Sequence, residues 1–332
     1  MLKIGLIGFG AWVRSAHLPA LQRDGRGRVV AVAAASEKTR EYARSVLGEE
    51  IAVFESWDEL LCKAQVDAVM VAVPDELHQA ALTAALEAGV PVFYEPPVSH
   101  RREQIPVVLQ KLLTAKQVTF AHIELCYHPI IARAAELIRG GEIGLLQSAV
   151  ITLNANWGCT KESDICLLDR MSCWNVDVLN HIAGGLPERV MVLDGHGGSG
   201  RMQSASIGVY DYGGVWGIIK ADLHRPDGVS IQIEITGSEG NIQLDYFTGV
   251  LRRQSLKHPE PVHETVLPLQ PFADYPAVRE TVTAFLDAVE SGNREKGNAR
   301  AVAALNLIGL AVEESKDTGN WAEVRKLENY SF

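Results

Sequence analysis

The chain begins with a short apolar segment, Leu2 to Ile7, that stops at the turn Gly8-Phe9-Gly10 and is followed by a segment with helical spacing. A buried strand, a glycine-rich turn and a helix in this order are typical of a dinucleotide-binding unit, although an ordinary strand-to-helix turn also fits. Gly8 permits the tight turn, and Gly10, which lacks a Cβ atom, lets a pyrophosphate approach the backbone N–H groups of the helix start. Val13 replaces the third glycine of the pattern, so the helix must lie further from the strand or pack through that side chain.

The alternation of strand and helix continues without a break to residue 121. Further strands are expected at 28–35, 67–73, 92–94 and 117–121, and helices at 37–47, 75–88 and 100–115. This pattern predicts an α/β fold whose first domain, residues 1–121, is a Rossmann domain with a doubly wound parallel sheet. Ligands of such sheets bind beyond the carboxyl ends of the strands, so the turns at those ends are expected to line one crevice.

The predicted cofactor site consists of residues at these strand ends. They are Gly8, Phe9, Gly10, Ala11, Trp12, Ser36, Val73, Pro74, Glu95 and Pro96. At the end of the second strand an acidic residue would select NAD by binding the ribose, whereas a small polar residue with an Arg nearby tolerates the phosphate of NADP. Ser36 stands there with Lys38 and Arg40 close by, which favours NADP, while Glu37 keeps NAD open.

The pattern changes after residue 121. Strands are expected at 146–154, 189–193, 205–210, 215–223, 230–236, 240–245 and 262–267, with helices at 129–139, 169–183, 277–289 and 299–315. Many of these strands alternate polar and apolar residues, as Ile231 to Ile235 do, which predicts antiparallel pairing with one face buried. Residues 122–332 are therefore expected to form an α+β domain with a large open, mostly antiparallel sheet. That domain is interpreted as the substrate-binding and oligomerisation domain, and its sheet offers a face for forming a homodimer or homotetramer.

The composition excludes several classes of function. The chain has 332 residues, 47% of them hydrophobic, and a formal charge of −10 without any dense run of Lys or Arg, so neither nucleic acid nor a membrane surface is an expected partner. Its five cysteines include no C-x-x-C pair, so neither a disulfide framework nor a metal site is predicted. With no signal-peptide core, the expected location is the cytoplasm.

Six motifs together carry a family resemblance. They are I-G-F-G-A at 7–11, A-V-P-D-E-L-H at 72–78, A-L-E-A-G-V-P-V-F-Y-E-P-P at 85–97, Y-H-P at 127–129, G-E-I-G at 141–144 and G-S-E-G at 237–240. The chain thereby resembles the Gfo/Idh/MocA family of oxidoreductases, named for glucose-fructose oxidoreductase and inositol dehydrogenase. The resemblance implies reversible hydride transfer between a nicotinamide cofactor and a carbinol carbon of a small polar substrate, such as a sugar or cyclitol. It also places His78 among the cofactor-binding residues, although His78 and His122 are equally well explained as packing residues.

Two residues that the family uses to move protons are missing. Pro96 stands where the family has the Lys of its Glu-Lys-Pro motif, and Trp174 stands where it has a helical His. Proline has no titratable group, so it cannot take over proton transfer. The catalytic candidates are therefore Asp177, His181 and Tyr94. Asp177 and His181 are four residues apart and share a helix face, although an exposed helix histidine explains His181 as well.

The resemblance also implies a set of substrate-binding residues. They are His17, Tyr127, Trp157, Arg170, Trp174 and Asp177. The leading interpretation is an NAD(P)-dependent oxidoreductase with replaced acid–base residues, acting on an alcohol or on an imine or enone. The alternatives are a catalytically inactive NAD(P)-binding sensor or regulatory protein, and a fold that has lost dinucleotide binding.

Overall fold

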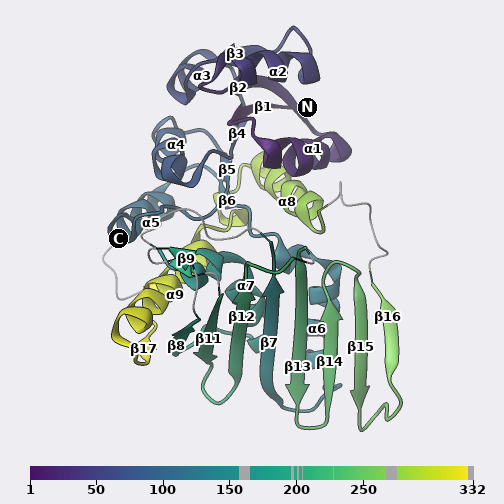
Figure 1. Ribbon diagram of the computed structural model, residues 1–332. Coiled ribbons are helices and arrows are strands. Elements are labelled where there is room, and N and C mark those ends of the chain that lie inside the picture. Colours follow the sequence, from purple (N-terminus) through teal and green to yellow (C-terminus); the bar gives the residue numbers. More distant parts are fainter. Residues whose placement is uncertain are drawn as a thin grey trace. The chain divides into compact units, whose positions relative to one another are not determined.

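The computed structural model describes residues 1–156, 165–195, 198–199, 202–203, 205–226, 228–266 and 275–327. The chain divides into two compact units (Figure 1). Within the described ranges, the first unit holds residues 1–122 and 275–303, and the second holds residues 123–266 and 304–327. No helix in these ranges combines the length and the apolar character needed to cross a bilayer.

The first unit contains a six-stranded sheet in the order β3-β2-β1-β4-β5-β6. Its strands are β1 (Leu2–Ile7), β2 (Gly27–Ala33), β3 (Ala52–Phe54), β4 (Ala68–Val71), β5 (Val92–Tyr94) and β6 (Thr119–Ala121). Every neighbouring pair is parallel. The order reverses at β1, so the crevice for a ligand is expected next to the carboxyl end of that strand. The predicted Rossmann fold is confirmed, with β3 as a short strand that the sequence analysis did not identify.

The first unit also contains α-helices and short helical turns. They are η1 (Val13–His17), α1 (Leu18–Asp24), α2 (Glu37–Leu47), α3 (Trp57–Lys63), α4 (Asp75–Glu87), η2 (Arg102–Gln104), α5 (Ile105–Thr114), α8 (Val278–Ser291) and η4 (Arg294–Lys296). Ser36 and Ser56 accept hydrogen bonds from Thr39 N and Glu59 N, at 3.1 and 3.2 Å, and thus cap α2 and α3. Val13, at the missing glycine, is buried where the π-helical turn η1 opens, so the helix packs through this side chain.

Helix α8 belongs to the first unit, although sequence order suggested that everything after residue 121 lies in the second domain. Arg26 Nη1 donates to Asp287 Oδ1 at 2.5 Å and to Glu290 Oε2 at 3.0 Å, and both carboxylates lie on α8. Asp24 holds the guanidinium from the other side, with Nε and Oδ1 2.7 Å apart. The hydrogen bonds to Arg26 hold the pKa of Asp24 down at about 2. Helix α8 is thus fixed against α1.

The second unit contains a nine-stranded sheet in the order β16-β15-β14-β13-β7-β12-β11-β8-β17. Its strands are β7 (Leu146–Asn154), β8 (Arg189–Asp194), β11 (Ala205–Asp211), β12 (Trp216–Asp222), β13 (Ser230–Gly237), β14 (Gly240–Asp245), β15 (Val250–Ser255), β16 (Val262–Thr265) and β17 (Ala322–Glu323), and β9 (Gly198–Ser199) pairs with β10 (Met202–Gln203) apart from it. Strand β12 runs parallel to β7, and the other pairs are antiparallel. The predicted open, mostly antiparallel sheet is confirmed.

One face of this sheet carries helices. They are η3 (Leu125–Tyr127), α6 (Pro129–Arg139), α7 (Leu167–Ala183) and α9 (Ala299–Thr318), which begins in the first unit. Helix α7 contacts β7, β11 and β12, and α6 contacts β15, and Figure 1 shows both behind the strands. The residues of the opposite face include Leu193, Ile207 and Trp216, which are 53%, 37% and 41% exposed. The described residues therefore leave an apolar band on β8, β11 and β12 uncovered.

Candidate functional site

The glycine turn after β1 has the backbone that the sequence analysis expected. Gly8 has φ +95°, and a Cβ atom built there would lie 2.1 Å from the carbonyl oxygen of Ala72. Only glycine fits that position. Gly10 is different, since no heavy atom of the described residues beyond its chain neighbours lies within 4 Å of the place where its Cβ would stand. The space beside Gly10 is thus open to a ligand, while Phe9 is buried and Ala11 is exposed.

A carboxylate with three N–H groups around it lies at the ends of β5 and β6. The Oε1 atom of Glu95 is 2.6 Å from His17 Nε2, 2.8 Å from His122 Nδ1 and 2.8 Å from Trp12 Nε1. Burial alone raises the pKa of Glu95, but the charge of His122 and the hydrogen bonds from both histidines outweigh it, so this pKa lies well below its ordinary value. Burial lowers the pKa of His17. Glu95 is therefore an anion held by imidazole and indole groups.

This cluster brings together three residues that the sequence analysis assigned separately. Glu95 and Trp12 were predicted to bind the cofactor, and His17 was predicted to bind substrate. His122, taken as a packing residue, joins them from the residue after β6. The only sequence signal for His122 was its position directly after a predicted strand. Its contact with Glu95 and His17 could not be predicted, because it depends on the parallel pairing of β5 with β6.

The end of β2 presents Ser36 and Arg40, and Glu37 follows as the first residue of α2. Ser36 Oγ lies 2.7 Å from Thr39 Oγ1. Arg40 Nη1 donates to the carbonyl oxygens of Ala34 and Ala35, both at 2.8 Å, and Nη2 donates to Glu55 at 3.2 Å. The guanidinium is thus fixed directly under the tip of the strand, where an adenosine ribose is expected to lie.

His78 joins the loops that follow β4 and β5. Its Nε2 lies 2.8 Å from the carbonyl oxygen of Val73, and its Nδ1 lies 2.9 Å from that of Pro97. Both ring nitrogens therefore face the backbone, which makes His78 a residue that positions Val73, Pro74 and Pro96. Pro96 is buried and precedes a cis peptide bond to Pro97. Tyr94 is fully buried at the end of β5.

The acidic candidate of the second unit, Asp177, lies on α7 against the turn η3. Burial raises the pKa of Asp177 to about 6, and a hydrogen bond with the Cys126 thiol opposes this rise. Burial and the charge of Asp177 also raise the pKa of Tyr127 to about 12. Asp177 therefore changes its charge close to neutral pH, as a general acid or base must, while Tyr127 stays a neutral donor.

Trp174, Tyr127 and Asp177, all predicted to bind substrate, lie together in this unit. Trp174 Nε1 donates to Glu124 Oε2 at 2.8 Å. Arg170 is half-buried two turns before Asp177 on α7, and His181 is exposed one turn after it. Trp157 lies outside the described residues. Glu124 and Cys126 were not predicted, because only the packing of η3 on α7 brings them to this cluster.

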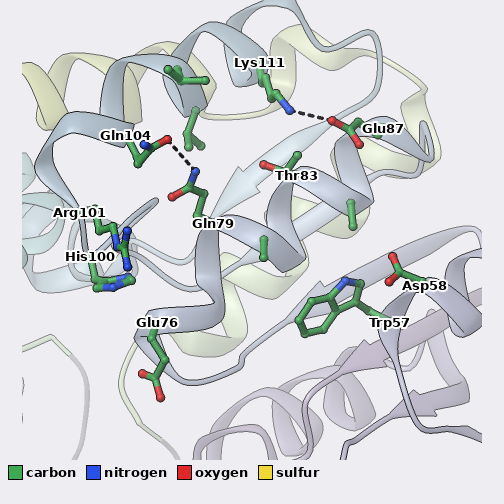
Figure 2. Close-up of a pocket in the computed structure, with 14 residues that line it drawn as sticks. Trp57, Asp58, Glu76, Gln79, Thr83, Glu87, His100, Arg101, Gln104 and Lys111 are labelled. Carbon is green, nitrogen blue, oxygen red and sulfur yellow. Dashed lines mark hydrogen bonds and ion pairs between the residues drawn. The ribbon is translucent and has the colours of Figure 1, made fainter.

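A separate groove on the first unit lies between α3, α4 and α5 (Figure 2). Two pairs of its polar side chains interact, with Gln79 Nε2 donating to Gln104 Oε1 at 3.2 Å and Lys111 Nζ lying 2.7 Å from Glu87 Oε1. Helix sides form its walls, whereas cofactors of parallel sheets bind at strand ends. The groove is therefore not assigned to the candidate site.

A comparison with protein-family models gives a match in the first unit. Residues 2–122 match the model of the Gfo/Idh/MocA oxidoreductase family, described as having an NAD-binding Rossmann fold. The whole chain is 23% identical to a D-xylose 1-dehydrogenase (NADP⁺) of Haloferax volcanii over 97% of this chain and 100% of that protein. It is also 23% identical to an inositol 2-dehydrogenase of Rhizobium meliloti, over 74% of this chain and 76% of that protein.

Solved structures extend the similarity of fold to both units. A levoglucosan dehydrogenase in complex with NADH and levoglucosan is 19% identical, with a TM-score of 0.80 over 98% of this chain and 100% of that chain. An oxidoreductase domain protein from Kribbella flavida is 20% identical, with a TM-score of 0.83 over 98% and 99% of the two chains. The two-domain fold expected from the sequence therefore agrees with the fold of these solved structures over nearly the whole chain.

Proposed function

We propose that the protein is an NAD(P)-dependent oxidoreductase that transfers hydride to and from a carbon of a small sugar-like or cyclitol-like substrate, with Asp177 exchanging the proton. The cofactor binds in the first unit, against the amides of residues 9–12. Similarity to xylose and inositol dehydrogenases supports a hydroxylated substrate. The observation that carries the proposal is the buried carboxyl of Asp177, whose pKa of about 6 suits proton transfer at neutral pH.

The proton step follows from the two charge states of this carboxyl. In oxidation, the Asp177 carboxylate would accept the hydroxyl proton of the substrate, and a bound oxidised nicotinamide would accept the hydride from the carbon that carries this hydroxyl. In reduction, neutral Asp177 would donate a proton to the carbonyl oxygen, and the reduced nicotinamide would supply the hydride to the carbonyl carbon. Neither step needs a Lys at position 96 or a His at position 174.

The test is a search for hydride transfer with stereospecifically deuterated NADPH and NADH. A panel of aldoses, inosone-type ketones and cyclic imines is incubated with the full chain, and the product is examined by mass spectrometry for one deuterium. Transfer to any substrate, lost in Asp177→Asn, supports the proposal. The second candidate is an inactive dinucleotide-binding sensor, which Pro96 and Trp174 favour because both replace proton carriers. Tight NAD(P)H binding without deuterium transfer across the panel would establish that candidate and overturn the first.

We propose further that NADP is the preferred cofactor, because Ser36 and Arg40 stand at the tip of β2 where an NAD-selecting carboxylate is missing. Ser36→Asp is expected to raise the KM for NADPH about tenfold or more and to leave the KM for NADH unchanged or lower, since a carboxylate repels the 2′-phosphate and accepts from ribose hydroxyls. Aspartate caps a helix as well as serine does, so α2 is expected to stay folded. Initial-rate kinetics with both cofactors measures the effect.

Ser56→Asp is the matched control for this substitution. It makes the same change at the cap of α3, where Ser56 accepts from Glu59 N at 3.2 Å. It is expected to change neither KM. If Ser36→Asp keeps the wild-type melting temperature and also the wild-type preference between NADPH and NADH, NADP selection at this position is contradicted.

The protein is also proposed to assemble as a dimer or tetramer through the open face of the nine-stranded sheet. Ile207, Trp216 and Leu193 are exposed there on adjacent strands, and such an apolar band marks an interaction surface. Ile207→Glu is expected to shift the protein to monomers, because it places a charge inside the buried interface. Sedimentation velocity measures the shift, and Leu256→Glu, at a site 76% exposed beyond β15, is the control expected to leave the assembly intact. An unchanged assembly in Ile207→Glu contradicts this interface.

A further inference from the structure

The cluster around Glu95 contains the ligand set of a metal site. His17 Nε2, His122 Nδ1 and one carboxylate oxygen of Glu95 all lie within 4.8 Å of one another, and no other group of three His, Cys, Asp or Glu side chains in the described part of the chain does so. Two imidazoles and one carboxylate are a common set of zinc ligands, and a set of three leaves one position for water. The three side chains come from η1, the end of β5 and the end of β6, so a folded backbone brings them together before any metal arrives.

The spacing of the donor atoms suits a small divalent ion. Ligands at bond lengths of about 2.0–2.1 Å around a tetrahedral ion lie about 3.3 Å apart. His17 Nε2 and His122 Nδ1 are 3.4 Å apart, so the two histidines already stand at that separation. The distances from Glu95 Oε1 to His17 Nε2, 2.6 Å, and to His122 Nδ1, 2.8 Å, are those of hydrogen bonds. An ion between the rings therefore requires the Glu95 oxygen to retreat by about half an ångström.

Glu95 is the ligand that can make this movement. Its side chain is 14% exposed, whereas those of His17 and His122 are 1% exposed. The histidine rings are fixed by aromatic neighbours. Phe93 lies edge-on to His17 with the ring centroids 5.4 Å apart, and Trp12 is tilted against His122 with the ring centroids 6.0 Å apart. The two fixed histidines thus form part of the metal site before the ion binds. The partly exposed Glu95 can move, so the ion can enter beside it.

A supporting hydrogen bond completes the arrangement. Trp12 Nε1 donates to Glu95 Oε1 at 2.8 Å, and carboxylates that bind metals are held by such outer donors. At His17, Nδ1 makes no hydrogen bond to the described residues, so the ring proton can move to Nδ1 and free the Nε2 lone pair without breaking a bond there. The bound ion would leave the site with one net positive charge, beside the position where Pro96 replaces the family's cationic Lys.

We propose that His17, Glu95 and His122 bind one zinc ion. This site does not depend on the proposed oxidoreductase activity. It was not anticipated from the sequence, where the three residues are widely spaced and no close pair of ligands marks them.

The untagged full-length chain, stripped with a chelator and dialysed against limiting Zn²⁺, tests the site by inductively coupled plasma mass spectrometry. One equivalent per chain is expected, together with a higher melting temperature than that of the stripped protein. Replacing Zn²⁺ by Co²⁺ is expected to give the visible absorption of a tetrahedral cobalt ion, without the near-ultraviolet thiolate band that cysteine ligands produce. Less than about half an equivalent, or a thiolate band, overturns the proposal on the wild-type protein alone.

Variants locate the ion. Glu95→Gln and His122→Gln are expected to abolish uptake, and Trp12→Phe to weaken the affinity about 10- to 100-fold, the range found when an outer donor is lost. His263→Gln and Glu55→Gln, which change exposed residues of the same types, are expected to bind one equivalent. One equivalent of zinc in Glu95→Gln, or a loss of zinc in both controls, contradicts the assignment to this cluster.

Discussion

Asp177→Asn is expected to make the protein more stable at pH 8 and to make it nearly inactive. The folded chain holds the pKa of Asp177 at about 6, against an ordinary value of 3.8. Because that pKa is raised, the folded state disfavours the carboxylate, and the cost is absent below pH 4, grows as the pH rises and is complete above pH 6 to 7. Removing it stabilises the fold by about 3 kcal/mol at pH 8.

Activity is expected to change in the opposite direction. Loss of a positioned acid or base reduces turnover about 10²- to 10⁴-fold, and Asn supplies neither a proton nor a base at neutral pH. In the wild type, kcat/KM for reduction is expected to fall as the pH rises through about 6, and kcat/KM for oxidation to rise, because these directions need the neutral and the ionised carboxyl respectively.

Urea unfolding at pH 4 and pH 8, with initial rates over the same range, measures both effects. Asp58→Asn is the control, since Asp58 is exposed on α3, and it is expected to shift stability by less than about 0.5 kcal/mol. Asp177→Asn with wild-type turnover contradicts the catalytic role. If Asp177→Asn and the wild type differ in stability by the same amount at pH 4 and pH 8, the raised pKa of Asp177 is contradicted instead. The catalytic role and the raised pKa can thus be disproved independently.

The fold was predictable from sequence because its signals are local. The run Leu2–Ile7 before Gly8 and the alternation in Ile231 to Ile235 each report a strand and its buried face within a few residues. Strand β15 was missed because Arg252 and Arg253 interrupt that alternation, although Arg253 is satisfied by Glu142, with Nη1 and Oε2 3.1 Å apart. Local patterns predict elements well, and they fail where distant partners neutralise a charge.

Long-range placement could not be predicted in the same way. Helix α8 joins the first unit through Arg26 and Asp287, which are 261 residues apart. The cluster around Glu95 depends likewise on His17 and His122, 105 residues apart, and neither a motif nor a periodicity links them. For Asp177, the sequence indicated the helix face but not the pKa, because burial in the folded chain causes that shift. The sequence thus identified candidate residues one at a time, and the chain's topology decided which of them meet.

Alanine substitutions at the two glycines of the first turn are expected to affect different properties, stability at Gly8 and cofactor binding at Gly10. Gly8→Ala combines φ +95° with a Cβ atom 2.1 Å from the Ala72 carbonyl oxygen, so the backbone of β1 or β4 must move. A loss of about 3 kcal/mol or more is expected, up to failure to fold, since strain and a backbone clash add together. In Gly10→Ala the new methyl group meets no heavy atom of the described residues within 4 Å apart from its chain neighbours, so stability is expected to stay within about 0.5 kcal/mol of the wild type.

At Gly10, cofactor affinity and not stability is expected to change on substitution. The reason is that the missing Cβ atom leaves room for the diphosphate to reach the amides of the helix start. Gly10→Ala is therefore expected to weaken NADPH and NADH at least tenfold, as measured by quenching of tryptophan fluorescence, while its urea midpoint stays at the wild-type value. Equal weakening of both nucleotides points to the diphosphate they share and not to the ribose end. If Gly10→Ala binds both as tightly as the wild type, the diphosphate does not dock at this turn, and Gly8 serves the connection of β1 to η1 alone.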